Sequence, residues 1–219
     1  MTEGRSYLRD PAAIYRRSFE LIEAETDLSR FPASMRPVAI RLAHAVGDPT
    51  ILADLSWSCG AADAGQRALA GGAPILVDSA MVAAGISRDR LPASDPASNL
   101  ASNKVICTLH EPAVRDIASR QATTRSAAAV ELWLPFLAGA VVAIGNAPTA
   151  LFRLLELLTG DAPKPAIILG FPVGFVGAAE AKEELLGCGD VAYIALRGRR
   201  GGSALAAAAV NALCGKALA

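Results

Sequence analysis

The sequence is poor in the side chains on which most metal sites and nucleophilic catalysts depend. Its 219 residues contain two histidines and four cysteines, and no two cysteines form a C-x-x-C pair. These residues are His44, His110, Cys59, Cys107, Cys188 and Cys214. Because the cysteines lie far apart, we expect neither a zinc site nor a disulfide framework. We expect all four cysteines to be buried free thiols without a functional role.

Net charge and familiar loop motifs are also absent. The 21 basic and 21 acidic residues cancel, so neither nucleic acid nor an anionic membrane is an expected partner. The sequence has no Walker A loop, no G-x-S-x-G turn and no H-E-x-x-H helix. An enzyme built from this chain would therefore act through acid–base groups and binding, and no metal is expected.

One long apolar run raises the question of a membrane. Residues 126–152 carry a single charge, Glu131, over a length that could cross a bilayer. Prolines and glycines interrupt the run at Pro135, Gly139, Gly145 and Pro148. A helix, a buried strand and a second helix explain it better than a membrane span. Residues 1–5 lack the apolar core of a signal peptide, so the chain is expected in the cytoplasm.

What the sequence does contain is an alternation of short apolar runs and helical stretches. The runs are 73–77, 105–109, 140–144, 166–169 and 191–196, with a less distinct one at 52–57. Helices are expected near 60–71, 79–85, 111–120, 125–137, 148–159, 177–187 and 202–215. Continuous apolar runs are typical of strands buried on both faces. We therefore predict a single α/β domain over 1–219, with a mostly parallel sheet and helices on both faces.

The first helix is expected over residues 11–25, with Pro11 in its first turn. Ile14, Ser18, Leu21 and Ile22 share one face at helical spacing. Ser18 is thus a hydroxyl on a predicted apolar stripe. It either bonds back to its own helix or contacts a ligand.

A second helix is expected to start with Ser34 as its cap and to end before Gly47. Val38, Leu42 and Ala45 form its predicted apolar stripe. Arg41 and His44 lie on the flank of this stripe.

The pair Arg41 and His44 is the most informative feature of the chain. Residues three apart on a helix point to the same side, and histidine is the side chain that titrates near neutral pH. The residues alone leave two readings open, a satisfied structural histidine or a catalytic one.

The turns that follow the strands are the expected place for a ligand, because parallel sheets bind ligands beyond the carboxyl ends of their strands. In 143–149, Asn146 or Ala147 would cap a helix whose free N–H groups suit an anion. Asp78 follows the run 73–77 as a turn residue or a site residue. Arg125 opens a helix against its dipole, and a bound carboxylate would remove that conflict.

Two further loops stand out. Residues 169–177 are a second glycine-rich exit from a strand, but they do not match the dinucleotide fingerprint G-x-G-x-x-G. Residues 92–103 are rich in turn formers and read as a disordered surface insertion or a flap over the site.

Several segments taken together closely resemble the precorrin-8X methylmutase family of cobalamin biosynthesis. They are SYLRDP at 6–11, Ile14-Tyr15, Ser18-Phe19, RLAHAVG at 41–47, APILVD at 73–78, VICTL at 105–109, TRSAA at 124–128, IGNAPTAL at 144–151 and GFPVGFVGAAE at 170–180. The resemblance covers nearly the whole chain. Residues 92–104 depart from it, since they are longer than the link expected in the family.

The resemblance implies an isomerase that moves a methyl group from C-11 to C-12 of a corrinoid tetrapyrrole, precorrin-8X or cobalt-precorrin-8. The product would be hydrogenobyrinic or cobyrinic acid. It also implies an α/β homodimer with an active site shared by both subunits. The migrating methyl is already on the substrate, so no cofactor is expected.

The resemblance also implies the site residues. The family's catalytic histidine maps onto His44, which would deliver a proton to a ring nitrogen as a general acid. Its substrate-contacting positions map onto Ser18, Arg41, Asp78, Arg125 and Asn146. Arginines and helix N-termini facing one cavity would hold the carboxylates of the macrocycle. A tetrapyrrole carrier without catalysis and, less well matched, a dinucleotide-dependent oxidoreductase are the alternatives.

Overall fold

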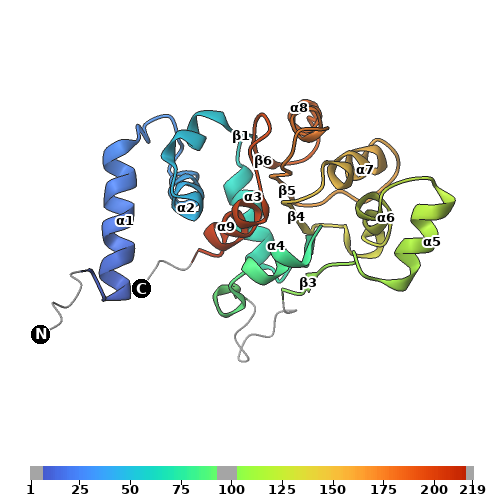
Figure 1. The fold of residues 1–219 in the computed structure, drawn as a ribbon, viewed down its shortest axis with the longest axis horizontal. Helices are drawn as coiled ribbons and strands as arrows, with labels where there is room; N and C mark the ends of the chain where they lie inside the picture. The colour runs from blue at the N-terminus through green and yellow to red at the C-terminus, as the bar shows by residue number, and fades with distance from the viewer. Residues whose placement is uncertain (1–6, 93–102, 216–219) are drawn as a thin grey trace, which may run out of the picture.

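A computed structural model describes residues 7–92 and 103–215, which are organised around one twisted sheet (Figure 1). Its strands are β1 (Leu55–Trp57), β2 (Ile75–Val77), β3 (Val105–Ile106), β4 (Val141–Ile144), β5 (Ile167–Gly170) and β6 (Tyr193–Leu196). Their order is β1-β6-β5-β4-β2-β3, and every neighbouring pair is parallel except β1 with β6. The predicted mostly parallel α/β fold is confirmed.

The central strands are buried on both faces, as their continuous apolar sequence predicts. Side chains of β4 alternate between two cores: Val141 and Ala143 belong to one cluster, Val142 and Ile144 to the other. Each predicted strand run overlaps a strand; five strands are shorter than their runs, and β5 has the length of its run but begins and ends one residue later. In 52–57, the first half continues a 3-10 helix, Pro49–Asp54, and β1 occupies only the last part.

Helices cover both faces of this sheet. The first core is built with α2 (Arg36–Val46), α3 (Ala61–Ala70), α4 (Ala80–Gly85) and α9 (Ser203–Leu213). The second is built with α6 (Arg125–Glu131), α7 (Pro148–Leu158) and α8 (Ala178–Gly187), while α5 (Pro112–Arg120) packs against α6. Figure 1 shows α1 (Pro11–Glu25) and α5 at opposite ends of the molecule, with the sheet between them.

Helix α1 has the predicted bounds but a different inward face. Ile14 and Leu21 are 44% and 41% exposed, so half of the predicted stripe is wrong. Ile22 is buried, and Ser18 is half-buried. The helix lies at the edge of the molecule and packs mainly against α2, so it buries a narrower face than a helix inside a layer would.

Helix α2 ends as predicted and begins differently. Gly47 terminates it in the left-handed conformation, with φ 64°. Its N-cap is Met35, which makes no side-chain capping bond, so the predicted cap by Ser34 is wrong. Ala45 is exposed, because the buried face runs through Val38, Ala39, Ile40, Leu42 and Ala43.

The helix predicted over 125–137 is two pieces. The α-helix α6 stops at Glu131, and a 3-10 turn, Leu134–Phe136, follows it. Pro135 has no N–H to donate, which prevents the α-helical pattern from continuing. Within the described residues, no helix has the length and apolarity to cross a membrane.

Two further expectations have different outcomes. The four cysteines are free, but only Cys214 is buried; Cys107 and Cys188 are partly buried and Cys59 is exposed. Burial of all four was therefore wrong. Most of the loop 92–103 lies outside the described residues.

Candidate active site

The candidate site is organised by the edge of the sheet at which the parallel strands end. Because β1 is antiparallel to β6, its first residue, Leu55, pairs with the last residue of β6, Leu196. The backbone N–H of Arg197 donates to the Asp54 carbonyl at 2.9 Å. This pairing brings the segment that follows α2 to the same edge, so the end of the His44 helix joins the post-strand loops there.

His44 contacts Ser18 across two helices. The Ser18 Oγ and the His44 Nδ1 are 2.8 Å apart. With a neutral imidazole the hydroxyl donates to Nδ1, and with an imidazolium Nδ1 donates to the hydroxyl. Of the two readings of Ser18, the bond to its own helix is not the one observed. Nε2 of His44 has no hydrogen-bond partner among the residues that the structure describes.

Two aromatic rings hold the imidazole. Tyr15 stacks on it, with centroids 5.2 Å apart and an interplanar angle of 29°, and Phe19 meets it edge-on at 5.5 Å. Tyr15, Ser18 and Phe19 stand three and four residues apart on α1, so they share one face. Their spacing is the sequence signal for this contact face, which the apolar stripe through Ile14 obscured.

Electrostatics around His44 disfavour its charged form. Burial lowers the pKa of His44 below its ordinary value, and the nearby Arg41 charge lowers it further. Arg41 is itself half-buried: burial lowers its pKa first, and the charge of Arg90 adds to that effect. Among the described residues Arg41 forms no ion pair. An external carboxylate would relieve this uncompensated positive charge.

A cavity of about 170 Å³ adjoins the imidazole. Ser18, Ala43, His44, Gly47 and Asp48 are among the residues that line it. It is too small for a macrocycle by itself, since ligand pockets for drug-sized molecules have volumes of about 300–1,000 Å³.

Asp78 occupies the turn that was predicted to bind an anion. Its carboxylate accepts hydrogen bonds from the backbone N–H groups of Gly145 at 2.9 Å, Asn146 at 2.9 Å and Ala147 at 2.8 Å. These N–H groups are therefore not free for a ligand, and that expectation was wrong. Burial raises the pKa of Asp78, while the three N–H donors oppose that rise.

Asn146 stays exposed in this turn while its backbone is held on both sides. Its N–H donates to Asp78, and its carbonyl accepts from the Val173 N–H at 3.4 Å. The amide side chain is thus presented by a fixed backbone at the end of β4. Asp78 is 3% exposed and its carboxylate is bonded to this backbone, which identifies it as the group that holds the turn.

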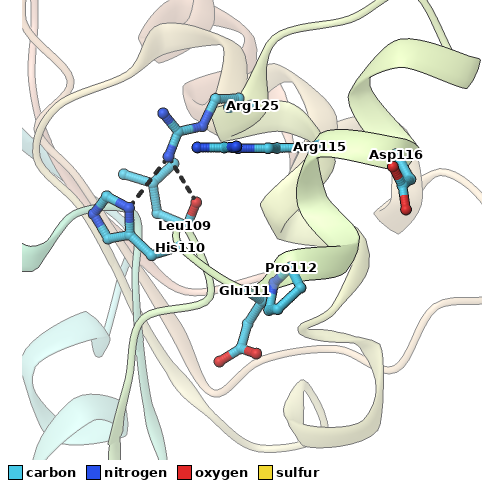
Figure 2. A pocket seen from close by; sticks show the side chains of 7 residues that line it. All are labelled: Leu109, His110, Glu111, Pro112, Arg115, Asp116 and Arg125. Atoms are coloured by element: carbon cyan, nitrogen blue, oxygen red, sulfur yellow. Dashed lines mark hydrogen bonds between the residues drawn. The ribbon is translucent and has the colours of Figure 1, made fainter.

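Arg125 lines a separate cavity of about 430 Å³ (Figure 2). Its Nη2 donates to the Leu109 carbonyl and approaches His110 Nδ1, each at 3.2 Å. Arg115 lines the same cavity. Arg125 places a positive charge at the positive end of the helix dipole, and the partial negative charge of the Leu109 carbonyl offsets part of it. Thr124 caps that helix.

Four of the predicted site residues form two groups in this chain, and Asp78 and Asn146 lie between them, at the ends of β2 and β4. Ser18, Arg41 and His44 lie beyond β6, and Arg125 lies beyond β3. Four strand intervals separate β6 from β3, or roughly 19 Å at ordinary strand spacing. Among the cavities described here, none contains both His44 and Arg125. The expectation of one cavity is not met within a single chain.

Comparison with known proteins relates this arrangement to one family. The family model for precorrin-8X methylmutase (CbiC) matches residues 13–215. A precorrin-8X methylmutase of Pseudomonas aeruginosa is 56% identical over 208 residues, which are 94% of this chain and 96% of that protein. A cobalt-precorrin-8 methylmutase of Methanothermobacter thermautotrophicus is 36% identical over 202 residues, covering 91% and 90%.

A solved structure agrees with these relatives. The crystal structure of a precorrin-8X methylmutase from Thermus thermophilus superposes with a TM-score of 0.81 at 40% identity, covering 92% of this chain and 94% of that one. The chain belongs to the precorrin-8X methylmutase family, the isomerases of cobalamin biosynthesis.

Proposed function

We propose that this chain moves a methyl group from C-11 to C-12 of the precorrin-8X macrocycle, with His44 as the general acid. The observation that carries the proposal is the contact between Ser18 Oγ and His44 Nδ1. This contact occupies one ring nitrogen and leaves Nε2 as the atom that can give a proton to the substrate. Stacking on Tyr15 and Phe19 keeps the ring plane in place.

The proposed reaction is an intramolecular 1,5-shift. The bond from the methyl carbon to C-11 breaks and a bond to C-12 forms, while a macrocycle nitrogen accepts a proton from His44 and later returns it. A group with a lowered pKa is a stronger acid when it is protonated. Substrate carboxylates near Arg41 would offset its charge and favour the protonated imidazole in the complex.

The carboxylates of the macrocycle match the arginines of the two groups. The half-buried guanidinium of Arg41 forms no ion pair within residues 7–92 and 103–215, and Arg125 lines the larger cavity. Planar guanidinium groups bind carboxylates with two parallel hydrogen bonds. The exposed Asn146 amide would add a polar contact, and Asp78 would contribute by holding the turn. No cofactor takes part in this scheme.

A homodimer with a shared active site would bring the two groups together. The cavity beside His44 is too small for a tetrapyrrole, and the Arg125 cavity lies near the other end of the sheet. Ile14 and Leu21 on α1 are exposed apolar side chains next to the Ser18 face. A contiguous exposed apolar surface marks an interaction site, and these two side chains of one helix would contribute to such an interface. Such a dimer would work in the cytoplasm.

Conversion of precorrin-8X by the purified protein, followed by visible absorption, tests the proposal. His44→Ala should lose conversion and keep substrate binding. Unchanged turnover in this variant would contradict the acid role. A wild-type protein that binds the macrocycle without converting it would instead be a carrier.

Parallel assays with metal-free and cobalt-containing substrate decide between the two substrate forms, since relatives of both kinds are similar to this chain.

A further inference from the structure

Lys182 is a charged side chain in the interior that the proposed reaction does not use. It lies on α8, and its exposed fraction is 0%. Ala178, Ala181 and Leu185 share its buried face at helical spacing. Taking an ammonium group out of water is costly unless strong partners replace the water, so its partners indicate what the burial achieves.

The partners of Lys182 are two backbone carbonyls from different loops. Its Nζ donates to the Pro172 oxygen at 3.1 Å and to the Arg200 oxygen at 2.7 Å. Pro172 follows β5 and Arg200 follows β6, so both loops lie at the carboxyl edge of the sheet. Burial lowers the pKa of Lys182 to about 8, which leaves the ammonium mostly protonated at neutral pH.

The backbones of the two loops also contact each other directly. The Gly202 N–H donates to the Phe171 carbonyl at 2.8 Å, and the Gly174 N–H donates to the Arg199 carbonyl at 3.3 Å. A Cβ on Gly201 would clash with the backbone oxygens of Phe171 and Pro172. Such close packing gathers carbonyl oxygens, whose partial negative charges repel, and the Lys182 charge offsets that repulsion.

The paired loops also connect the Asn146 turn with the segment at the end of the His44 helix. On one side, the Val173 N–H donates to the Asn146 carbonyl. On the other, the Arg200 guanidinium bonds Asp54 at 2.6 Å and lies 3.5 Å from Asp48, which lines the cavity beside His44. The unit that Lys182 holds therefore lies between Asn146 and the end of the His44 helix.

We propose that Lys182 is a positioning residue for substrate binding, which holds the loops 171–174 and 199–202 together at the carboxyl edge. Lys182 does not touch the substrate; it acts through the carbonyls of Pro172 and Arg200. This inference rests on the proposed function for the identity of the substrate. The contact itself does not depend on that identity.

The main test compares Lys182→Met with Lys164→Met. Methionine keeps much of the volume and removes the charge and all N–H donors. Lys164 is an exposed lysine before β5, at the opposite edge, where it pairs with Asp190 at 2.9 Å. Lys182→Met should raise the KM for precorrin-8X by about tenfold and change kcat by less than about threefold. Lys164→Met should change neither, and Lys182→Arg should recover part of the lost affinity.

A second pair of variants separates the loops without touching the lysine. Gly201→Ala would push the Phe171 and Pro172 backbone away, whereas a Cβ on Gly189 meets nothing within 4 Å. Gly201→Ala should therefore raise the KM as Lys182→Met does, and Gly189→Ala should not. This pair keeps the proposal testable if Lys182→Met does not fold.

Amide hydrogen exchange distinguishes failure of this proposal from failure of the proposed function. In Lys182→Met, exchange at Gly174 and Gly202 should accelerate, with no such change in Lys164→Met. Unchanged exchange would overturn the proposal whatever the enzyme's activity. Faster exchange with an unchanged KM would also overturn it, because the loops would then not serve binding. Lack of turnover in the wild type would refute only the proposed reaction.

Discussion

His44 and Asp78 are two titratable groups at the same edge of the sheet, and the protein holds them in opposite ways. His44 is half-buried, and in the part of the chain that the structure describes it has one side-chain hydrogen bond, to Ser18 on a helix at the edge of the molecule. Asp78 is buried, and three backbone N–H groups bond its carboxylate. Burial shifts both pKa values toward the uncharged form. His44 thus keeps a ring nitrogen available for a reaction, whereas the carboxylate of Asp78 is fully used in holding the backbone.

The two environments follow from where each residue lies in the core. Asp78 directly follows β2, whose residues Leu76 and Val77 pair with Val142 and Ala143 of β4. This register brings Asp78 to the turn at the end of β4. His44 depends on α1, of which only Ile22 is buried. We therefore expect changes at His44 to affect the reaction and changes at Asp78 to affect stability.

The largest expected effect is the loss of catalysis when His44 is replaced. His44→Ala should lower kcat for precorrin-8X by about 10³-fold, because general acid catalysis contributes about 10²–10⁴-fold. Stopped-flow absorption of the macrocycle measures it. Val46→Ala, an exposed change on the same helix, is the control. A kcat within about threefold of wild type would show that His44, like Asp78, does not act in the reaction.

The next largest effect is on stability, at Asp78. Asp78→Ala leaves the N–H groups of the turn without their acceptor, so the free energy of unfolding should fall by about 3 kcal/mol. Urea denaturation measures the loss, and Asp161→Ala at an exposed turn is the matched control. Equal stability of the two variants would show that the carboxylate does not hold the turn.

A smaller effect is expected where α1 meets α2. Ser18→Ala removes one half-buried hydrogen bond, which is worth about 1 kcal/mol, so kcat should fall by about five- to tenfold. Unfolding in urea should change far less than in Asp78→Ala. If Ser18→Ala instead lost stability without losing kcat, the contact between Ser18 and His44 would serve the fold, as the contacts of Asp78 do.

The smallest effect is a shift in titration. Arg41→Met removes a charge that lowers the pKa of His44, so the imidazole should titrate at a higher pH than in the wild type. Both midpoints should stay below the ordinary value of 6.5, since burial is the larger cause. NMR titration of His44 measures this, and an unchanged or lower midpoint would contradict it.

The same shift has a consequence for stability. Because the folded state disfavours the imidazolium, the unfolded state binds the proton more tightly. The contribution of His44 to the free energy of unfolding should therefore decrease as the pH falls below 6.5 toward the lower folded-state pKa.

The sequence by itself determined the class of the fold and most of its elements. Continuous apolar runs marked the buried strands, since a strand covered on both faces has no polar alternation. Helix α1 began at Pro11, and α2 stopped at Gly47, because those residues favour such positions locally. The resemblance to a family also pointed to His44 before its surroundings were known.

Only the tertiary structure decided how those residues are used. Ser18 and His44 are 26 positions apart, and Asp78 is 67 to 69 positions from the N–H groups that it accepts. A local pattern cannot specify partners at such separations, so the N–H groups of 145–147 looked free and the partners of Lys182 could not be predicted. The buried spacing of Ala178, Ala181 and Lys182 was visible in the sequence. The reason why Lys182 is buried is its hydrogen bonds to the carbonyls of Pro172 and Arg200, which the packing of two loops brings together.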